Sequence, residues 1–244
     1  MIKSSIKLKE KESNFFKFTK KRIRKTFKIH SYSGWNKSLI ICIQFNSSDS
    51  IDNLFIKRYF PQIFNKEKIF IIVSGKSKFH SNKKILNLKK LDAISIFLDN
   101  FYYNFKCKKN TQLFIVSSQN FKVRKCKSIY FNFEKDIKAI DIWGGQCLSR
   151  SYTGVDLNLV LFDLKSGFKF SDKGHMNEQI TWLISGSMNF YCNNLKGRLT
   201  KKNGIDIGAF HEHGGISNGA QGFDAFFPKR KEKKYNYKSK FLRF

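Results

Sequence analysis

Several polar side chains in the last third of the chain could bind a metal ion. His175 and Gln179 lie in the stretch SDKGHMNEQITWLISG, residues 171–186, and His213 lies further along in GAFHEHGG. Imidazole nitrogens bind divalent metals at about 2.0–2.2 Å, and an amide oxygen can accept a cation. His211 lies two residues before His213, so on an extended strand both imidazoles would face the same side. Three groups, with His211 as a fourth candidate, could therefore hold a divalent ion.

A regular strand would sort the side chains of this stretch onto two faces. Lys173, His175, Asn177 and Gln179 would point into a barrel interior, and Glu178 would point outward. A lysine ammonium has no lone pair unless it loses its proton, so it would repel a metal ion. Two interpretations remain open: a site for Mn, Fe, Zn or Ni, or a metal-free pocket in which Lys173 contacts a small anion.

Placing these residues together requires β structure. Helical periodicity is weak, and short runs of Ile, Phe, Val and Leu recur about every ten residues between polar turns. This pattern is typical of an all-β sandwich or barrel. We expect strands at 37–45, 68–74, 84–88, 93–98, 112–117, 128–132, 157–163, 180–185, 187–192, 205–210 and 223–227.

An internal repeat indicates two homologous β domains. Residues 69–96 align with residues 180–207 at an offset of 111 and without a gap, and nine aligned positions are identical. Both segments have the order strand, Ser-Gly turn, strand, polar turn, strand. The expected organisation is a basic N-terminal extension (1–33), a first barrel (34–136), a second barrel with the candidate site (137–230) and a basic tail (231–244).

Each repeat resembles a cupin, a small antiparallel jelly-roll barrel that commonly holds a metal in its mouth. The first cupin motif reads G-x5-H-x-H-x3,4-E-x6-G. Its spacing is kept here as Gly167-x5-Lys173-x-His175-x3-Gln179-x6-Gly186. Lys173 replaces the first histidine, and Gln179 replaces the acid.

Other features of the second repeat extend the resemblance. Some cupins carry a Glu-Gln pair, like Glu178-Gln179 here, and use the glutamine oxygen as a ligand. The second cupin motif, G-x5-P-x-G-x2-H-x3-N, is kept at His213, whereas Asn218 lies one residue beyond the expected asparagine. The resemblance implies a bicupin, two tandem antiparallel jelly-roll barrels, and a homodimer is plausible because many cupins pair through barrel edges.

The resemblance also implies roles for residues around the site. A divalent ion would polarise a carboxylate or carbonyl oxygen of a small organic or sugar acid, and Lys173 or Glu178 would transfer protons. Arg150 could clamp a substrate carboxylate, with Asn177 as a second contact. Dioxygenase, decarboxylase, isomerase and lyase chemistry all remain open, because a fold does not fix a function.

The first repeat serves as an internal comparison for the site. At the offset of 111, its ligand positions hold Gln62, Phe64, Lys68 and Tyr102, none of which is a good metal ligand. We therefore expect the N-terminal barrel to be structural.

Composition limits the other classes of function. The net charge is +29, but 39 of the 47 basic residues are Lys, together with many Phe, Ile and Asn. An AT-rich genome explains this bias, and nucleic-acid interfaces usually favour Arg, so nucleic acid is an unlikely partner. No apolar run is long enough to span a membrane, no secretory signal is recognisable, and the five cysteines lack a CxxC pair. We expect reduced thiols and a cytoplasmic protein.

Overall fold

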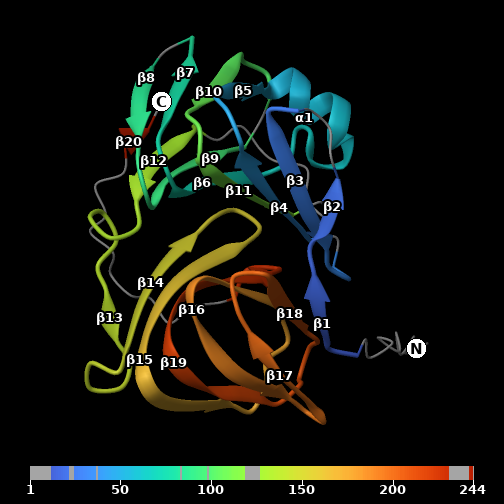
Figure 1. Ribbon diagram of the computed structural model, residues 1–244, viewed down its shortest axis with the longest axis vertical. Coiled ribbons are helices and arrows are strands. Elements are labelled where there is room, and N and C mark those ends of the chain that lie inside the picture. Colours follow the sequence, from blue (N-terminus) through green and yellow to red (C-terminus); the bar gives the residue numbers. More distant parts are fainter. Residues whose placement is uncertain are drawn as a thin grey trace, which may run out of the picture.

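The structure, a computed structural model, describes residues 12–21, 25–36, 38–82, 84–97, 99–118, 127–230 and 242–243 (Figure 1). Its regular structure is mainly antiparallel β, which confirms the predicted fold class. The short helices α1 (Asn53–Tyr59) and η1 (Pro61–Ile63) were not predicted, since seven residues are too few for a clear helical period. No helix in the described part of the chain is long and apolar enough to cross a membrane.

Two sheets form the N-terminal barrel. The larger has the order β2 (Thr19–Lys21), β3 (Phe27–Ser33), β4 (Ser38–Phe45), β11 (Gln112–Ser118), β6 (Lys68–Ser74), β9 (Asp92–Ile96), β12 (Ile129–Asn132) and β20 (Leu242–Arg243). The smaller has the order β5 (Asp49–Asp52), β10 (Tyr103–Cys107), β7 (Ser77–Ser81) and β8 (Ile85–Leu88). Alternate side chains from both sheets, such as Ile41, Phe70 and Phe105, fill the space between them with a dense apolar core.

One eight-stranded sheet forms the C-terminal barrel. Its order is β1 (Asn14–Lys17), β18 (Asn203–Ile207), β16 (Glu178–Cys192), β19 (His213–Phe227), β15 (Asn158–Asp172), β14 (Cys147–Thr153) and β13 (Ile140–Asp141), and β17 (Leu195–Leu199) pairs with β16. The register of β16 on β19 shifts on both sides of Gly186, which has φ +71° and no room for a side chain against Gly219. This bulge lets one long strand curve around the barrel.

The structure confirms the internal repeat. Strands β7 and β9 recur, at the offset of 111, as residues 188–192 of β16 and residues 203–207 of β18. In both Ser-Gly pairs the glycine adopts the left-handed conformation, with φ +80° at Gly75 and +71° at Gly186. The four described cysteines are buried and unpaired, whereas Cys126 lies outside the described residues.

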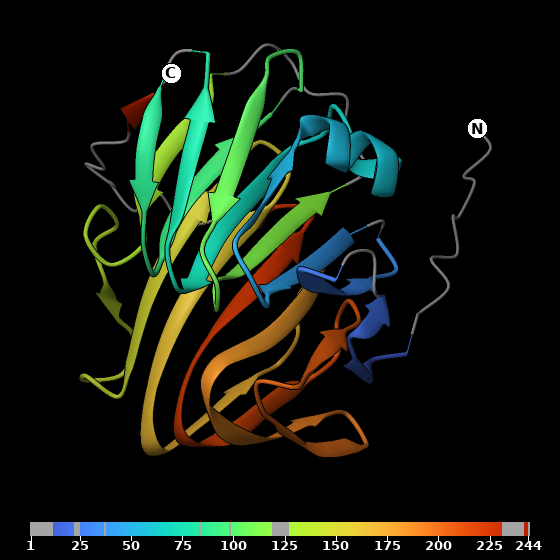
Figure 2. The same cartoon turned by 45° about the horizontal axis from the view of Figure 1, so that its top comes forward.

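The two ends of the chain cross to the opposite barrel (Figures 1 and 2). Strand β1 pairs with β18 in the C-terminal barrel, whereas β20 pairs with β12 in the N-terminal sheet. The prediction of an extension at 1–33 is therefore wrong for its described part, which supplies β1, β2 and β3. Its lysines suggested a solvated tail, but Phe16 between them is buried and stacks on Tyr32 at 3.6 Å. Only 242–243 of the predicted tail lie in the described part of the chain.

A second apolar core joins the two barrels. It combines Ile69 and Phe114 of the N-terminal barrel with Leu159, Trp182 and Phe223 of the C-terminal barrel. Trp182 stacks on Phe114 with ring centroids 5.7 Å apart, so its side chain packs against the other barrel.

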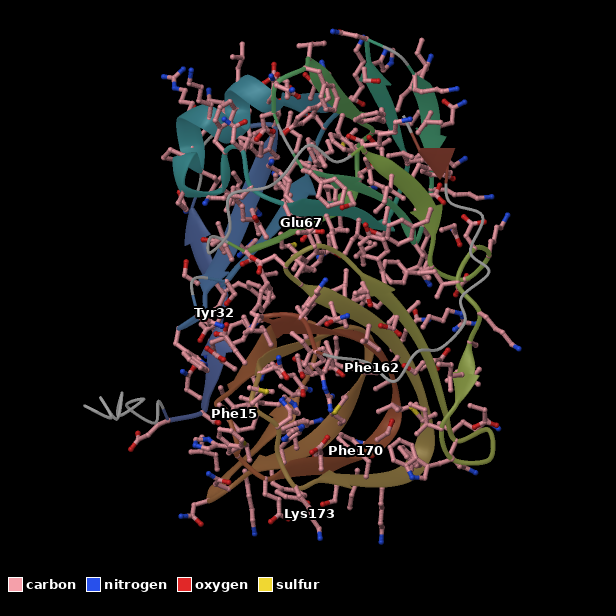
Figure 3. All side chains as sticks on the ribbon, turned by 180° about the vertical axis from the view of Figure 1, so that it is seen from behind. Phe15, Tyr32, Glu67, Phe162, Phe170 and Lys173 are labelled. Carbon is pink, nitrogen blue, oxygen red and sulfur yellow. The ribbon has the colours of Figure 1, made fainter. Side chains whose placement is uncertain are left out.

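Each barrel also sends one buried glutamate to a loop of the other barrel. Glu67, at the start of β6, lies between the barrels in Figure 3. Its carboxylate oxygens accept the backbone N–H groups of Val155 and Asp156, at 3.0 and 2.8 Å. A side chain on Gly154 would overlap this carboxylate, so only glycine fits there.

Glu178, at the offset of 111 from Glu67, makes the reciprocal contact. Its Oε1 accepts the backbone N–H of Trp35, and its Oε2 accepts the hydroxyl of Ser38, both at 2.8 Å. A side chain on Gly34 would overlap Glu178 as well. The two loops are related in sequence, SYSG at 31–34 and SYTG at 151–154. We call these two contacts the glutamate clamps.

We predict that protein stability falls as pH rises and that Glu67→Gln weakens this dependence. Burial raises the pKa of Glu67 from 4.5 to about 7, so the folded state holds a proton that the unfolded state releases. The contribution is complete below the unfolded pKa and is lost as pH rises through the folded pKa. Burial and the neighbouring Asp206 also raise the pKa of Glu178, in the same direction.

Urea denaturation between pH 4.5 and 8 would measure the effect. One proton changes the free energy of unfolding by at most about 1.4 kcal/mol per pH unit. Glu67→Gln should reduce the slope of the unfolding free energy against pH by a measurable part of that value. Glu12→Gln, at an exposed position, should leave this slope unchanged. Equal slopes for wild type and Glu67→Gln would contradict the prediction.

Candidate metal centre

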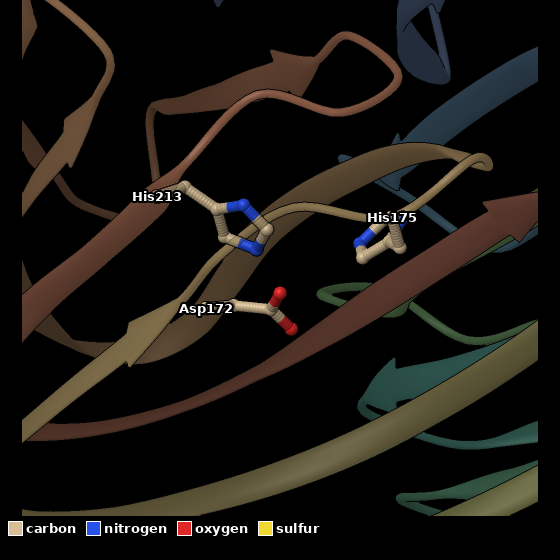
Figure 4. A group of neighbouring side chains, drawn as sticks. All are labelled: Asp172, His175 and His213. Atoms are coloured by element: carbon tan, nitrogen blue, oxygen red, sulfur yellow. The ribbon is translucent and has the colours of Figure 1, made fainter.

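Three side chains converge where β15 ends and β19 begins. Asp172 and His213 are direct partners across these two antiparallel strands, and His175 follows in the connection to β16. One ligand atom from each residue lies within 4.8 Å of the others (Figure 4). Within the described residues, no other group of histidine, cysteine and acidic side chains comes this close.

A tight turn aims His175 at the other two residues. Gly174 has φ +95°, and a side chain there would collide with the backbone of Phe210. The Gly174 N–H donates to Asp172 Oδ1 at 2.8 Å, and the Phe210 N–H donates to the His175 carbonyl at 2.7 Å. The turn is therefore fixed from both sides, and only glycine can make it.

The hydrogen bonds leave one free nitrogen on each imidazole. His213 Nδ1 lies 2.9 Å from the His211 carbonyl and must donate to it, so His213 Nε2 keeps its lone pair. His175 Nε2 lies 2.8 Å from Gln179 Oε1 and donates to it, so the lone pair is on Nδ1. That nitrogen is buried and has no hydrogen-bond partner among the described residues.

The electrostatics of the site favour neutral imidazoles. Burial lowers the pKa of both His175 and His213, and the positive charge of Arg230 lowers both further. A metal binds the neutral imidazole, so both side chains are held in the form that coordination needs. Two oriented imidazoles and one carboxylate fit a divalent transition metal.

Gln179, the predicted glutamine ligand, lies next to the site and contacts His175. Its oxygen holds His175, and its Nε2 donates to Thr181 Oγ1 at 3.0 Å. The Thr181 hydroxyl in turn donates to Asp224 Oδ1 at 2.5 Å. Burial raises the pKa of Asp224 to about 6. A chain of hydrogen bonds therefore links His175 to a second carboxylate in the barrel.

The structure contradicts the predicted inward position of Lys173, whereas Glu178 points out of its barrel as predicted. Lys173 is exposed at the outer end of the C-terminal barrel (Figure 3). Strand β15 ends at Asp172 and β16 begins at Glu178, so strict alternation does not extend across 173–177. Glu178 lies in its clamp, on the side of β16 opposite to Gln179. Neither residue reaches the site, so proton transfer by them has no geometric support.

His211 was the fourth metal candidate, and it points away from the group. Its Nδ1 lies 2.6 Å from the Ser13 hydroxyl. The prediction that His211 and His213 share a face fails because β19 begins only at His213. His211 instead contributes its backbone carbonyl, which orients His213.

The two predicted substrate contacts also lie outside the pocket. Ser149 and Ser151 line it, and Arg150 between them on β14 belongs to the opposite face. Asn177 is buried, and its side chain donates to the Pro228 carbonyl at 2.7 Å.

The pocket next to the three residues has a volume of about 710 Å³. Asp172, Asp224 and Arg230 line it, and the sequence reasoning named none of them. Asp172 could have been found as the residue directly before Lys173, which occupies the first histidine position of the motif. Asp224 and Arg230 lie in the run FDAFFPKR, but only the fold shows that these two side chains face inward.

The N-terminal barrel fills the corresponding position with an ion pair. Lys68, which aligns with Gln179, contacts Asp99 at 2.7 Å with both side chains fully buried, and the Tyr103 hydroxyl donates to Asp99 at 2.6 Å. Tyr103 pairs with Ser81 as His213 pairs with Cys192, so Tyr103 occupies the histidine position, rather than the Tyr102 expected from the sequence offset. In this barrel the buried Asp99 carboxylate is therefore neutralised by the ammonium of Lys68.

We predict that Asp99→Ala destabilises the protein by about 3–5 kcal/mol, because it leaves the Lys68 ammonium buried without its counter-ion. Asp163→Ala, at an exposed position on β15, should change stability by less than about 0.5 kcal/mol. Urea denaturation at pH 7 would compare both variants with the wild type. A cost below about 1 kcal/mol for Asp99→Ala would mean that the pair contributes little.

Comparison of the sequence with models of known protein families and with curated proteins gives no match. Comparison with solved structures does. AerE from Microcystis aeruginosa superposes with a TM-score of 0.70 at 10% identity, over 87% of this chain and 98% of that chain. A cupin 2 conserved barrel domain protein from Leptotrichia buccalis has a TM-score of 0.57 at 12% identity, over 91% and 98%.

A third similar structure is Bacillus subtilis oxalate decarboxylase, described by its Mn(II) centres. Its TM-score is 0.66 at 8% identity, over 90% of this chain and 78% of that chain. The two tandem barrels, their internal repeat and these superpositions show that this chain has the fold of a bicupin. At such identities the similarity concerns the fold alone, so the function has to be argued from the site.

Proposed function

We propose that the C-terminal barrel binds a divalent metal ion through Asp172, His175 and His213 and takes a small organic acid beside it. The main support is the geometry of the group, in which one ligand atom from each residue lies within 4.8 Å of the others. In addition, His175 Nδ1 is buried and has no hydrogen-bond partner among the described residues. A polar atom buried without a partner is costly, and a bound cation would remove that cost.

The residues around the site indicate what each would contribute. When bound, the ion would act as a Lewis acid on a carboxylate or carbonyl oxygen of the ligand. Gln179 and the His211 carbonyl orient the two imidazoles, and Asp224 offers a carboxyl group with a raised pKa near the ligand. This donor set suits dioxygenase, decarboxylase, isomerase and lyase chemistry alike. The Mn(II) centres described for oxalate decarboxylase favour a metal in this fold.

We predict about one metal ion per wild-type chain after loading with Mn²⁺, Fe²⁺, Zn²⁺ or Ni²⁺ and removal of excess ions. The double variant His175→Ala/His213→Ala should retain less than about 0.1 ion per chain, because two of three ligands are lost. Elemental analysis by mass spectrometry would measure the metal content, with circular dichroism to confirm folding.

Lys173→Ala is the matched control, because Lys173 belongs to the same motif but is exposed. It should bind metal as the wild type does. Less than about 0.1 ion in the wild type, unchanged by the histidine substitutions, would overturn the metal proposal. The pocket would then be a metal-free binding site for small anions.

A further inference from the structure

The pocket beside the candidate metal centre is lined by aromatic side chains along much of its wall. These are Trp143, Phe162, Phe168, Phe170, Phe190 and Phe226. Phe162 and Phe170 lie in the interior of the C-terminal barrel in Figure 3. The charged groups that line the same pocket are three carboxylates, of Asp141, Asp172 and Asp224, and the guanidinium of Arg230.

Neighbouring rings of this wall follow one another from the surface inward. Trp143, half exposed, lies 5.2 Å from Phe168, and Phe168 lies 6.1 Å from Phe170 in a nearly parallel arrangement, measured between ring centroids. Phe170 lies 6.0 Å from Phe190, whose ring is nearly parallel to that of His213 at 6.1 Å. The aromatic surface therefore reaches the candidate metal centre.

Such a wall selects against a ligand covered with hydroxyl groups. A sugar acid would exchange its hydrogen bonds to water for contacts with phenylalanine rings, which accept none in return. A flat apolar group would instead gain contact area and ring stacking. The volume of about 710 Å³ has room for a ring system with a side chain.

Arg230 provides the polar end of the binding surface. Its guanidinium carbon lies 4.8 Å from the centroid of the Phe226 ring, and that ring contacts His175 at 5.3 Å. Within the described residues, no acidic group forms an ion pair with Arg230. A guanidinium that lies over a ring can still offer its N–H groups, which match a carboxylate in two parallel hydrogen bonds.

We propose that the pocket takes an aromatic carboxylic acid, with its carboxylate on Arg230 and its ring along the phenylalanine wall. This inference rests on the proposed function, because it assigns the substrate class of the same site. The bound ion would also offset the negative charges of Asp172 and Asp224, which otherwise oppose an anion.

Three probes separate the two parts of the inference: 3-phenylpropionate, its uncharged amide 3-phenylpropanamide, and the sugar acid gluconate. Isothermal titration calorimetry on the metal-loaded full chain should give at least about tenfold tighter binding of 3-phenylpropionate than of either other probe. Arg230→Gln should reduce the preference for acid over amide to within about twofold. Phe170→Leu should weaken 3-phenylpropionate at least about threefold and leave gluconate unchanged.

The matched control is Arg198→Gln on β17, because Arg198 is exposed and lies outside the pocket. It should behave as the wild type. Gluconate binding as tightly as 3-phenylpropionate would overturn the inference, as would an Arg230→Gln variant that keeps the preference for acid over amide. In the latter case the metal, rather than Arg230, holds the carboxylate.

Metal content, measured on the same samples, separates this inference from the proposed metal centre. A wild type without metal that still prefers 3-phenylpropionate in an Arg230-dependent way would support the inference and overturn the metal centre. Normal metal content without any preference among the probes would overturn the inference and leave the metal centre standing.

Discussion

The pair of glutamate clamps is the constraint on which the rest of the structure depends. A buried carboxylate is costly unless hydrogen-bond donors surround it, and Glu67 and Glu178 find theirs in the loop of the opposite barrel. Three of the four donors are backbone N–H groups of the loops and the fourth is the Ser38 hydroxyl at the start of β4, and Gly34 and Gly154 provide the space for close approach. Neither glutamate can be satisfied in this way by its own barrel, so the clamps fix how the barrels dock and where the shared apolar core forms.

Although the two barrels are related by the repeat, their interiors are filled differently. The N-terminal barrel closes its interior with apolar side chains and the ion pair of Lys68 with Asp99. The C-terminal barrel keeps a cavity, with His175 and His213 at the equivalent level. A fully buried ion pair carries its own counter-charge and leaves no room for a ligand. At this position the first barrel therefore holds an ion pair, whereas the second holds a cavity.

Periodicity and the repeat predicted the all-β fold, the two barrels and ten of the twenty strands in the described residues, because apolar alternation and recurring glycine turns are local signals. These signals did not predict where individual strands end. Gly174 interrupts the strand, so the inward position passes from Lys173 to Asp172. The relation between the segments SYSG and SYTG was not predicted. The elements α1 and η1 lengthen the first repeat, so these segments do not share the offset of 111. Arg230 could not be placed from sequence, since its position depends on packing against Phe226.

The clamps and the candidate metal centre meet at two consecutive residues. Successive side chains on a strand point to opposite faces, so Glu178 enters its clamp while Gln179 faces the pocket and holds His175. The Glu-Gln pair therefore joins two roles that neither residue could fill alone. The loop of the N-terminal barrel fixes the start of β16 through Glu178, and that strand fixes the amide that orients the imidazole. Docking of the N-terminal barrel thus positions a side chain beside the pocket of the C-terminal barrel, which gives a physical reason for the two to remain in one chain.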